Sequence, residues 1–520
     1  MQTILEDLHR AVQLRQQGDV GQAMEVCRRL LAIDPNLGDA WHLLGRSLYD
    51  QDRFGEALPI LQRAVELMPQ VPMVHRYLGL TYKALGQLAT AEACYHRALE
   101  LNPHYVEVRI SLGNVLQDQG RSEDAEAVYR ECLKRNPKHI EALTNLGTVL
   151  RRRGETDEAI ACYHTALALN PDLPDTLNNL GSAMADLGRL DEARAHYGRA
   201  IELRPNYAEA HLNMAGQYLM AGEWDIGWPE YEWRWKTKEM TPRSFKQPLW
   251  QGEDFTGKTI LLHAEQGLGD TIQFVRFIKF VKQRGGKVLF ECQKPLLKLL
   301  ANLPVDYLFA HGEPIPPFDV HAPMLSLPYI FRTTLPTLPA EIPYLFPLPE
   351  LVEQWRERLN QLDGFKIGIA WRGNPANSRD GIRSIPFRFL APLAQVPGVR
   401  LICLQKGADA EIAEHRDLIS ITDFTSELDV AAGAFMDTAA VMKCVDLIIA
   451  PCTSVVHLAG ALGVPTWLPL SSSPDWRWLL ECNDSPWYPT VRLFRQKKLN
   501  DWAGVFAEIK SELEIELRRR

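Results

Sequence analysis

A 34-residue period runs through the first half of the chain. Proline recurs at this step from Pro35 to Pro205. Alanine, glycine and tyrosine keep the same step in series that include Ala159, Gly147 and Tyr163. Because the four series stay in phase with one another, this half is predicted to be an array of structural repeats rather than one globular core.

Each repeat has the pattern of a pair of helices. Small residues such as Gly147 fall where two helices would cross closely, and Gly154 suits the turn between them. Pro171 breaks the second helix before the next unit begins. These motifs resemble the tetratricopeptide repeat over about residues 3–235. One helical pair cannot bury its own apolar stripe, so the resemblance implies a stacked α-superhelix with a concave face.

Asparagine recurs at the same step on the first helix of three successive units, as Asn145, Asn179 and Asn213. On a concave face, these amides would form a ladder that bonds an extended peptide backbone without reading its side chains. O-GlcNAc transferases hold protein substrates on such a ladder. The alternative is that asparagine is common at this consensus position and only faces water. We therefore treat the three asparagines as candidate acceptor-binding residues.

After Trp250 the periodicity changes, and short β-rich runs alternate with helical segments. A proline-rich passage at residues 336–349 divides these runs into two groups. Alternation of this kind predicts parallel sheets with ligands at the carboxyl ends of their strands. The expected strands are Thr259–Ala264, Lys287–Cys292, Asp306–Ala310 and Val320–Leu325 in the first group, and Lys366–Trp371, Arg400–Gln405, Leu418–Thr422, Asp446–Ala450 and Pro465–Leu468 in the second.

Two such sheets joined by a linker enclose a cleft, which is the arrangement of a GT-B glycosyltransferase with two Rossmann-like lobes. The predicted fold class is thus an α-helical repeat array followed by an α/β region. The predicted domains are the repeats at 1–235, a linker at 236–256, an acceptor-side lobe with the catalytic base at 257–348, and a nucleotide-sugar-binding lobe at 349–520.

Charge and cysteine usage exclude several other classes of protein. The formal net charge is −8 and the longest basic run is Arg518-Arg519-Arg520, which argues against nucleic acid or an anionic membrane as a partner. The nine cysteines form no Cys-x-x-Cys pair, so reduced thiols are expected. No apolar stretch reaches the roughly 18 residues that span a bilayer, and no secretory signal opens the sequence. A cytoplasmic protein is expected.

The first candidate site follows the strand that ends near His263. Gly267 and Gly269 allow the backbone to turn tightly and to approach a ligand, and Asp270 then opens a helix expected at Asp270–Arg284. Asp270 either caps that helix or faces the cleft as a general base. His263 is the other candidate for a catalytic group.

The second candidate site follows the strand Asp446–Ala450 and opens another helix. Thr453, Ser454 and His457 share the first turn of this helix because they are three or four residues apart. Free backbone amides, two hydroxyls and a possible imidazolium there predict a pyrophosphate-binding site. The alternative for His457 is a structural role in the core.

The third candidate set consists of polar side chains near the ends of two strands in the same lobe. Arg372, Arg379 and Arg383 follow one strand, and Gln405 and Lys406 follow the next. Each alone fits a solvated surface charge. Together they predict a clamp on one anionic ligand.

These segments carry a family resemblance. The strand followed by Gly267-Leu268-Gly269-Asp270, and the run from Thr453 to Pro465, resemble ADP-heptose heptosyltransferases and their repeat-fused bacterial relatives. The fusion to repeats is similar to the O-GlcNAc transferases. The resemblance implies an inverting transfer from a nucleotide-sugar without a metal ion or cofactor. It also implies that Asp270 is the base, that Thr453, Ser454 and His457 hold the diphosphate, and that Arg383, Gln405 and Lys406 assist.

One position departs from the family pattern, since Cys452 stands where an aspartate is usual. Its loss is expected to remove a helix N-cap. The predicted function is transfer of a sugar to a protein or peptide acceptor, on a serine or threonine hydroxyl, with the acceptor held by the repeats. The alternatives are a heptosyltransferase-like enzyme with a lipid-linked or oligosaccharide acceptor, and a non-catalytic scaffold that keeps the transferase fold.

Overall fold

The computed structural model describes residues 2–238, 240–374, 380–498 and 500–520. By its internal contacts, the chain divides into two compact units, Met1–Ala183 and Met184–Arg520. None of the helices in the described ranges is long and apolar enough to cross a membrane.

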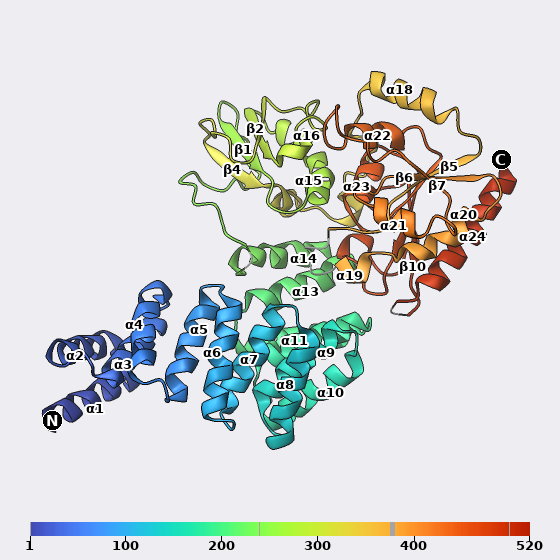
Figure 1. Ribbon diagram of the computed structural model, residues 1–520. Coiled ribbons are helices and arrows are strands. Elements are labelled where there is room, and N and C mark those ends of the chain that lie inside the picture. The colour runs from blue at the N-terminus through green and yellow to red at the C-terminus, as the bar shows by residue number, and fades with distance from the viewer. Residues whose placement is uncertain (1, 239, 375–379, 499) are drawn as a thin grey trace. The chain divides into compact units, whose positions relative to one another are not determined.

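The first unit consists of helices that pack in consecutive pairs, as the 34-residue period predicts (Figure 1). In chain order they are α1 (Gln2–Gln16), α2 (Val20–Ile33), α3 (Gly38–Tyr49), α4 (Phe54–Leu67), α5 (Pro72–Ala84), α6 (Leu88–Leu101), α7 (Val106–Asp118), α8 (Ser122–Arg135), α9 (Ile140–Arg152), α10 (Thr156–Leu169) and α11 (Pro174–Asp186), whose end lies in the second unit.

The glycine and tyrosine series mark where the two helices of one repeat touch. A Cβ added to Gly113 would lie 2.5 Å from Cε1 of Tyr129, and one added to Gly147 would lie 2.6 Å from Cε1 of Tyr163. Both tyrosine rings are fully buried. Gly154, in the turn, has φ +85°, a backbone conformation that favours glycine. The predicted close crossing and the predicted turn are both confirmed.

This packing predicts the stability of two matched variants. Gly113→Ala should lower the free energy of unfolding by about 1–3 kcal/mol, because the new methyl group has no space beside Tyr129. Gly55→Ala is the control, since a Cβ there meets nothing within 4 Å. That variant should be neutral or gain up to about 1 kcal/mol from helix propensity. Urea unfolding of both proteins measures the difference, and equal stabilities would contradict this account.

The second unit begins with the last helices of the repeat array and their aromatic end. Trp224 stacks on Trp487 with ring centroids 5.2 Å apart, and Trp228 meets Trp476 edge to face at 5.3 Å. All four rings are buried, so this aromatic segment has a structural role in the packing of the second unit. The elements are α12 (Leu190–Leu203), α13 (Ala208–Met220), α14 (Trp224–Tyr231) and the 3₁₀ helix η1 (Glu232–Lys236).

The first lobe is built on a parallel sheet of order β3-β2-β1-β4 within the described residues. All four strands were predicted from the sequence. The lobe contains β1 (Thr259–His263), α15 (Leu268–Phe274), η2 (Val275–Phe277), α16 (Ile278–Lys282), β2 (Lys287–Cys292), η3 (Lys294–Leu296), β3 (Tyr307–Ala310), β4 (Val320–Pro323), η4 (Met324–Ser326), α17 (Leu327–Ile330) and η5 (Leu335–Thr337).

The single helix predicted at Asp270–Arg284 is wrong in its bounds and its continuity. It begins at Leu268, tightens to a 3₁₀ turn at Val275–Phe277, and resumes as α16. The tight turn carries the buried Arg276, whose Nε donates to the Gln273 carbonyl at 3.0 Å.

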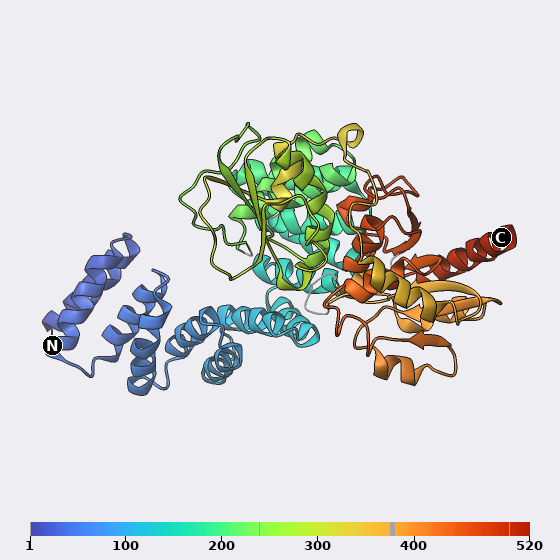
Figure 2. The same ribbon diagram turned by 90° about the horizontal axis from the view of Figure 1, so that it is seen from above.

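The second lobe, drawn in yellow to red in Figure 2, holds a parallel sheet within the described residues. Its strand order is β10-β9-β8-β5-β6-β7. Its elements are α18 (Pro349–Leu359), β5 (Phe365–Ile369), α19 (Asp380–Arg383), η6 (Phe387–Leu390), α20 (Ala391–Ala394), β6 (Val399–Cys403), α21 (Asp409–Glu414), β7 (Ile421–Asp423), α22 (Met436–Met442), β8 (Leu447–Ile449), α23 (Ser454–Ala461), β9 (Thr466–Leu470), η7 (Trp476–Trp478), β10 (Val491–Arg495) and α24 (Trp502–Arg519).

Sequence reasoning missed β10, which pairs with β9 at the edge of this sheet. Its exposed Arg492 alternates with the buried Val491 and Leu493, which is the pattern of a half-buried strand. Trp502, Phe506 and other apolar residues of α24 pack in the core cluster that contains residues of β5 and β6. The α/β nature of this region is thus established by two parallel sheets with helices between their strands.

Candidate functional site

A cavity of about 850 Å³ lies between the two lobes of the second unit. The first lobe contributes the segment from Gln266 to Asp270, which joins β1 to α15. The second lobe contributes the start of α23 and the segments that follow β5, β6 and β9. Since these segments all follow the carboxyl ends of parallel strands, the cavity lies where the fold predicts a ligand.

The structure brings most of the predicted site residues to this cavity. Arg379 lies outside the described residues. His263 does not belong to the lining. The predicted residues that line the cavity are Gly267, Gly269, Asp270, Arg372, Arg383, Gln405, Lys406, Thr453, Ser454 and His457.

Asp270 is the third residue of α15, with Gly267 at the N-cap position. Its Oδ2 accepts a hydrogen bond from the Gly267 backbone N–H at 2.9 Å. Its Oδ1 accepts one from Nη2 of Arg477 at 2.6 Å, across the lobes. Asp270 therefore stabilises the start of its helix and also faces the cavity, so the two roles that the sequence left open are compatible. Burial raises the pKa of this carboxyl, and the Arg477 guanidinium opposes the rise.

Arg477 is the cavity residue that sequence reasoning missed most clearly. It lies in η7, and its side chain is only 7% exposed. Its Nη1 donates to Oδ1 of Asp475 at 2.9 Å and its Nε to Oε1 of Gln273 at 2.6 Å. The guanidinium also lies 4.3 Å from the centroid of the Trp476 ring. The sequence signal for a buried, paired arginine was the run Trp476-Arg477-Trp478. Buried tryptophans on both sides carry the arginine into the interior, where its charge needs partners.

The start of α23 faces the start of α15. A Cβ added to Gly269 would lie 2.9 Å from Cδ2 of His457 and 3.4 Å from Cα of Ser454, so only glycine fits at this approach. Thr453 is the N-cap residue, and its Oγ1 is buried without a hydrogen-bond partner among the described residues. A buried hydroxyl without a partner beside free helix amides favours an anionic ligand here.

The expectation that Cys452 replaces the helix cap is wrong, because Thr453 occupies the N-cap position. Cys452 lies one residue earlier, and its Sγ accepts a hydrogen bond from Nε1 of Trp478 at 3.0 Å. Burial raises the pKa of its thiol to about 11, so the sulfur stays protonated at neutral pH. An aspartate here would instead place a charge in this buried environment.

Burial keeps His457 neutral, which argues against the possible imidazolium at this position and favours the alternative of a residue packed in the core. It is buried, and its Nδ1 lies 2.9 Å from the Tyr488 hydroxyl. Its ring stacks on Trp478 with centroids 5.6 Å apart. Burial, followed by the positive charge of Arg477, lowers its pKa to about 3. The side chain can offer a hydrogen bond to a ligand but not a charge.

Two cationic side chains of the second lobe are held by backbone carbonyls beside the cavity. Nη1 of Arg383 donates to the carbonyl of Cys452 at 3.1 Å, directly before the start of α23. Nζ of Lys406 donates to the carbonyl of Leu428 at 2.8 Å. Nε of Arg383 also pairs with Oδ1 of Asp380 at 3.1 Å, so its positive charge is partly compensated. The Leu428 carbonyl leaves the charge of Lys406 able to attract an anion.

Gln405 and Arg372 organise the loop after β5. Oε1 of Gln405 accepts hydrogen bonds from the backbone N–H groups of Trp371 and Arg372, at 3.3 and 3.0 Å. Nη2 of Arg372 donates to the carbonyl of Gly407 at 2.6 Å. Gln405 thus shapes the wall of the cavity, and its carbonyl oxygen is already engaged.

His263 lies at the end of β1 and is buried. Its Nε2 is 3.3 Å from Nδ1 of His321, on the neighbouring strand. Burial, followed by the positive charge of Arg243, lowers its pKa to about 3. The alternative that His263 faces the cavity as the catalytic group is therefore wrong. The side chain of a strand residue points to the face that the pleat dictates, and here that face is buried.

Two further lining residues have unusual backbones that no sequence pattern indicated. Asp429 and Phe435 line the cavity with φ +59° and +64°, although neither is glycine. Oδ2 of Asp429 accepts a hydrogen bond from the Thr438 hydroxyl at 2.6 Å, which fixes the loop. Strained backbone of this kind concentrates at ligand-binding sites.

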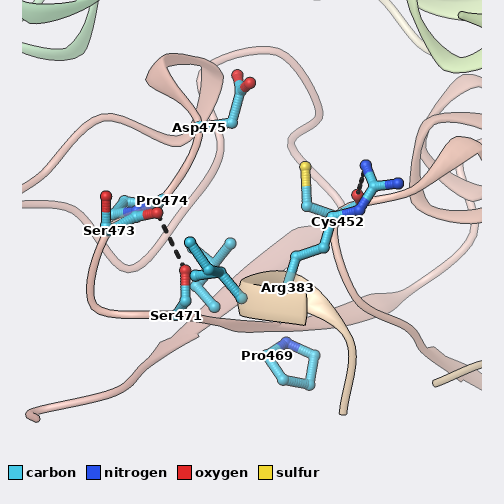
Figure 3. Close-up of a pocket in the computed structure, with 9 residues that line it drawn as sticks. Arg383, Cys452, Pro469, Ser471, Ser473, Pro474 and Asp475 are labelled. Carbon is cyan, nitrogen blue, oxygen red and sulfur yellow. Dashed lines mark hydrogen bonds between the residues drawn. The ribbon is translucent and has the colours of Figure 1, made fainter. Parts of the chain in front are cut away.

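A smaller cavity of about 110 Å³ adjoins the first and shares Arg383, Cys452 and Asp475 with it. Figure 3 shows the Arg383 guanidinium beside the Cys452 carbonyl, with Ser471 bonded to the carbonyl of Ser473 at the other side. This extension enlarges the space next to the start of α23.

Two of the three candidate asparagines already donate side-chain hydrogen bonds within the repeat array. Nδ2 of Asn145 donates to Oδ1 of Asn114 at 2.8 Å, and Nδ2 of Asn179 donates to Oγ1 of Thr148 at 3.2 Å. Each partner lies on the first helix of the preceding repeat, so these amides link neighbouring repeats. Asn213 lies on α13 in the second unit and is half-buried.

Comparison with known proteins identifies the first half of the chain. The sequence profile of the cilia and flagella-associated protein 70 C-terminal domain, a tetratricopeptide-repeat domain, matches residues 7–215. The N-terminal part of this chain is a tetratricopeptide-repeat array. Similar solved structures are YrrB, described as a TPR protein with an unusual peptide-binding site, and a tetratricopeptide-repeat protein from Parabacteroides merdae. YrrB is 19% identical with a TM-score of 0.30, over 36% of this chain and 96% of that one. The second is 17% identical with a TM-score of 0.41, over 47% and 95%.

A curated relative extends the likeness over a longer part of the chain. Protein FlbA of Caulobacter vibrioides is 28% identical over 319 residues, which are 57% of this chain and 53% of FlbA. The match therefore spans about half the length of that relative.

Proposed function

We propose that the second unit is an inverting, metal-independent glycosyltransferase of the GT-B type that uses a nucleotide-sugar donor and a protein or peptide acceptor. The observation that carries the proposal is the composition of one cavity. Asp270 approaches it from the first lobe, while Thr453, Ser454 and Arg383 approach it from the second. A group able to take a proton thus faces an anion-binding helix terminus.

The donor's diphosphate would bind at the start of α23. The backbone amides of its first turn and the Thr453 hydroxyl would donate hydrogen bonds to phosphate oxygens. Arg383 and Lys406 would supply positive charge, and His457 would add a neutral hydrogen bond. A leaving nucleoside diphosphate would be stabilised there without a metal ion.

Transfer would be a single displacement. Asp270 would take the proton from an acceptor hydroxyl as that oxygen attacks the anomeric carbon, and the bond from this carbon to the diphosphate oxygen would break. The nucleoside diphosphate would leave on the opposite face of the sugar, so the anomeric configuration would invert.

Titration calorimetry with uridine, guanosine and adenosine diphosphates tests the donor side directly. One of them should bind the intact chain, and the corresponding nucleotide-sugar should be hydrolysed or should label a co-purifying protein. Binding without any turnover would favour the non-catalytic scaffold. A labelled acceptor that resists trypsin would favour a lipid-linked or oligosaccharide acceptor.

The repeat array would hold the acceptor, and this gives a second prediction. Replacing Asn145, Asn179 and Asn213 together by alanine should raise the acceptor KM with little change in kcat or donor affinity. Each lost hydrogen bond is worth about 0.5–1.5 kcal/mol, so the triple variant should raise KM by roughly tenfold or more.

Asn136→Ala is the control for the asparagine variant. Asn136 is exposed in a turn, where its Oδ1 accepts a hydrogen bond from the Lys138 N–H at 3.2 Å. Its replacement should leave the acceptor KM unchanged. An unchanged acceptor KM in the triple variant would show that the three asparagines do not bind the acceptor.

A further inference from the structure

The Arg477 guanidinium links side chains of both lobes beside the cavity. Three of its nitrogens donate to three different side chains, those of Asp270, Asp475 and Gln273. Two of these partners belong to α15 of the first lobe, and Asp475 precedes η7 in the second. If this guanidinium turned to a substrate, the half-buried Asp270 carboxylate would lose its cationic partner.

The contact with Asp270 joins residues 207 positions apart in the chain. The Arg477 guanidinium meets Oδ1, while the Gly267 N–H holds Oδ2. Each carboxylate oxygen therefore has a donor in a fixed direction and keeps further lone pairs for an incoming proton. The Trp476 face, 4.3 Å from the guanidinium carbon, fixes the plane of the arginine.

We propose that Arg477 is a positioning residue, which holds the Asp270 carboxylate ionised and oriented toward the cavity from the opposite lobe. The inference rests on the proposed function for its catalytic meaning, but the pairing itself concerns only these side chains. Without Arg477, the half-buried carboxyl would lose its one cationic partner among the described residues. It would then favour the neutral acid, which cannot accept a proton.

The charged groups around Asp270 shift the pKa of its carboxyl in opposite directions, which an experiment can measure. Arg477 approaches from η7 and Asp475 from the position directly before it. Tyr231 approaches from α14 and the neutral His457 from α23. Burial raises the pKa of Tyr231 to about 12, so it stays uncharged at neutral pH. Arg477 favours the ionised Asp270, whereas the negative charge of Asp475 disfavours it. Loss of Arg477 and loss of Asp475 should therefore act in opposite directions.

The test compares R477Q, R477K and D475N in the full chain through the acidic limb of the pH profile of kcat/KM. Removing the guanidinium should move this limb upward by about 1 to 3 pH units, since an opposite charge at this distance lowers a carboxyl pKa by that amount. R477K should restore much of the wild-type profile, and D475N should move the limb downward. R276Q is the control, because Arg276 also joins the lobes, through the Trp487 carbonyl at 2.8 Å, without touching Asp270.

An isotope-edited infrared titration of the Asp270 carboxyl, assigned by subtraction of the D270N spectrum, gives the same readout without turnover. Opposite shifts in R477Q and D475N, with none in R276Q, would support the inference. Equal losses of activity in R477Q and R276Q with an unmoved Asp270 titration would overturn it. If D270N keeps full transfer, the proposed function fails instead, and the infrared shifts still decide the pairing.

Discussion

Asp270→Asn is expected to lose about 10²- to 10⁴-fold in transfer rate, the usual contribution of a general base. The amide keeps the shape of the side chain, and its single oxygen can still accept a bond from either Gly267 N–H or Arg477. Nucleotide binding should persist, because the proposed diphosphate site lies on α23 and not on α15. Single-turnover transfer and calorimetry on the same preparation measure both quantities.

His263→Ala is the matched comparison for Asp270→Asn. His263 is buried beside His321 and does not line the cavity, so its loss should lower stability and leave kcat largely intact. If the D270N variant keeps about a tenth of the wild-type transfer rate or more, above the range expected for a lost base, Asp270 is excluded from this role.

The second large effect is expected at the start of α23. Arg383→Ala should weaken nucleoside diphosphate binding by roughly 10- to 150-fold, since a charge-assisted hydrogen bond contributes about 1.5–3 kcal/mol. His457→Ala should weaken it less, by about 3- to 10-fold, because the imidazole is neutral and contributes one ordinary bond of about 0.5–1.5 kcal/mol. Titration calorimetry with the best-binding diphosphate checks both values.

Arg388→Ala is the control for the Arg383 variant. Arg388 is exposed, lies five positions further along the chain, and does not line the cavity. Its replacement removes the same formal charge from the same lobe and should leave affinity unchanged. Equal weakening by both variants would reduce the role of Arg383 to a long-range charge effect, and wild-type affinity in R383A and H457A would move the diphosphate away from α23.

The structure also changes the interpretation of Cys452, which stands where the family usually has an aspartate. The family resemblance made Cys452 a lost helix cap, whereas Thr453 occupies the N-cap position of α23, and the Cys452 sulfur accepts a hydrogen bond from Trp478. The indole N–H of Trp478, 26 positions along the chain, gives the neutral sulfur of Cys452 a hydrogen-bond donor.

The repeat array and the alternation of strands and helices were determined by the sequence itself. Gly113 and Tyr129 show why, because their spacing of 16 positions places a glycine of one helix on a ring of the next. The same contact recurs between Gly79 and Tyr95 and between Gly147 and Tyr163. Strand–helix alternation is likewise local, since a strand must be followed by its crossover before the next parallel strand can pair. Features of this kind can be predicted from the sequence because they depend on residues that are close to one another in the chain.

The tertiary structure alone decided which residues share the candidate site and in what state. Arg477 meets Asp270 from 207 positions away, and no periodicity or local spacing marks such a pair. The His263 ring is buried beside Phe245 and His321, whose ring centroids lie 5.8 and 5.5 Å away and which come from distant parts of the chain. The ionisation of His457 depends on burial and on Arg477, both of which arise from distant segments. Local geometry follows from short-range sequence, whereas pairing and desolvation depend on the whole packed chain.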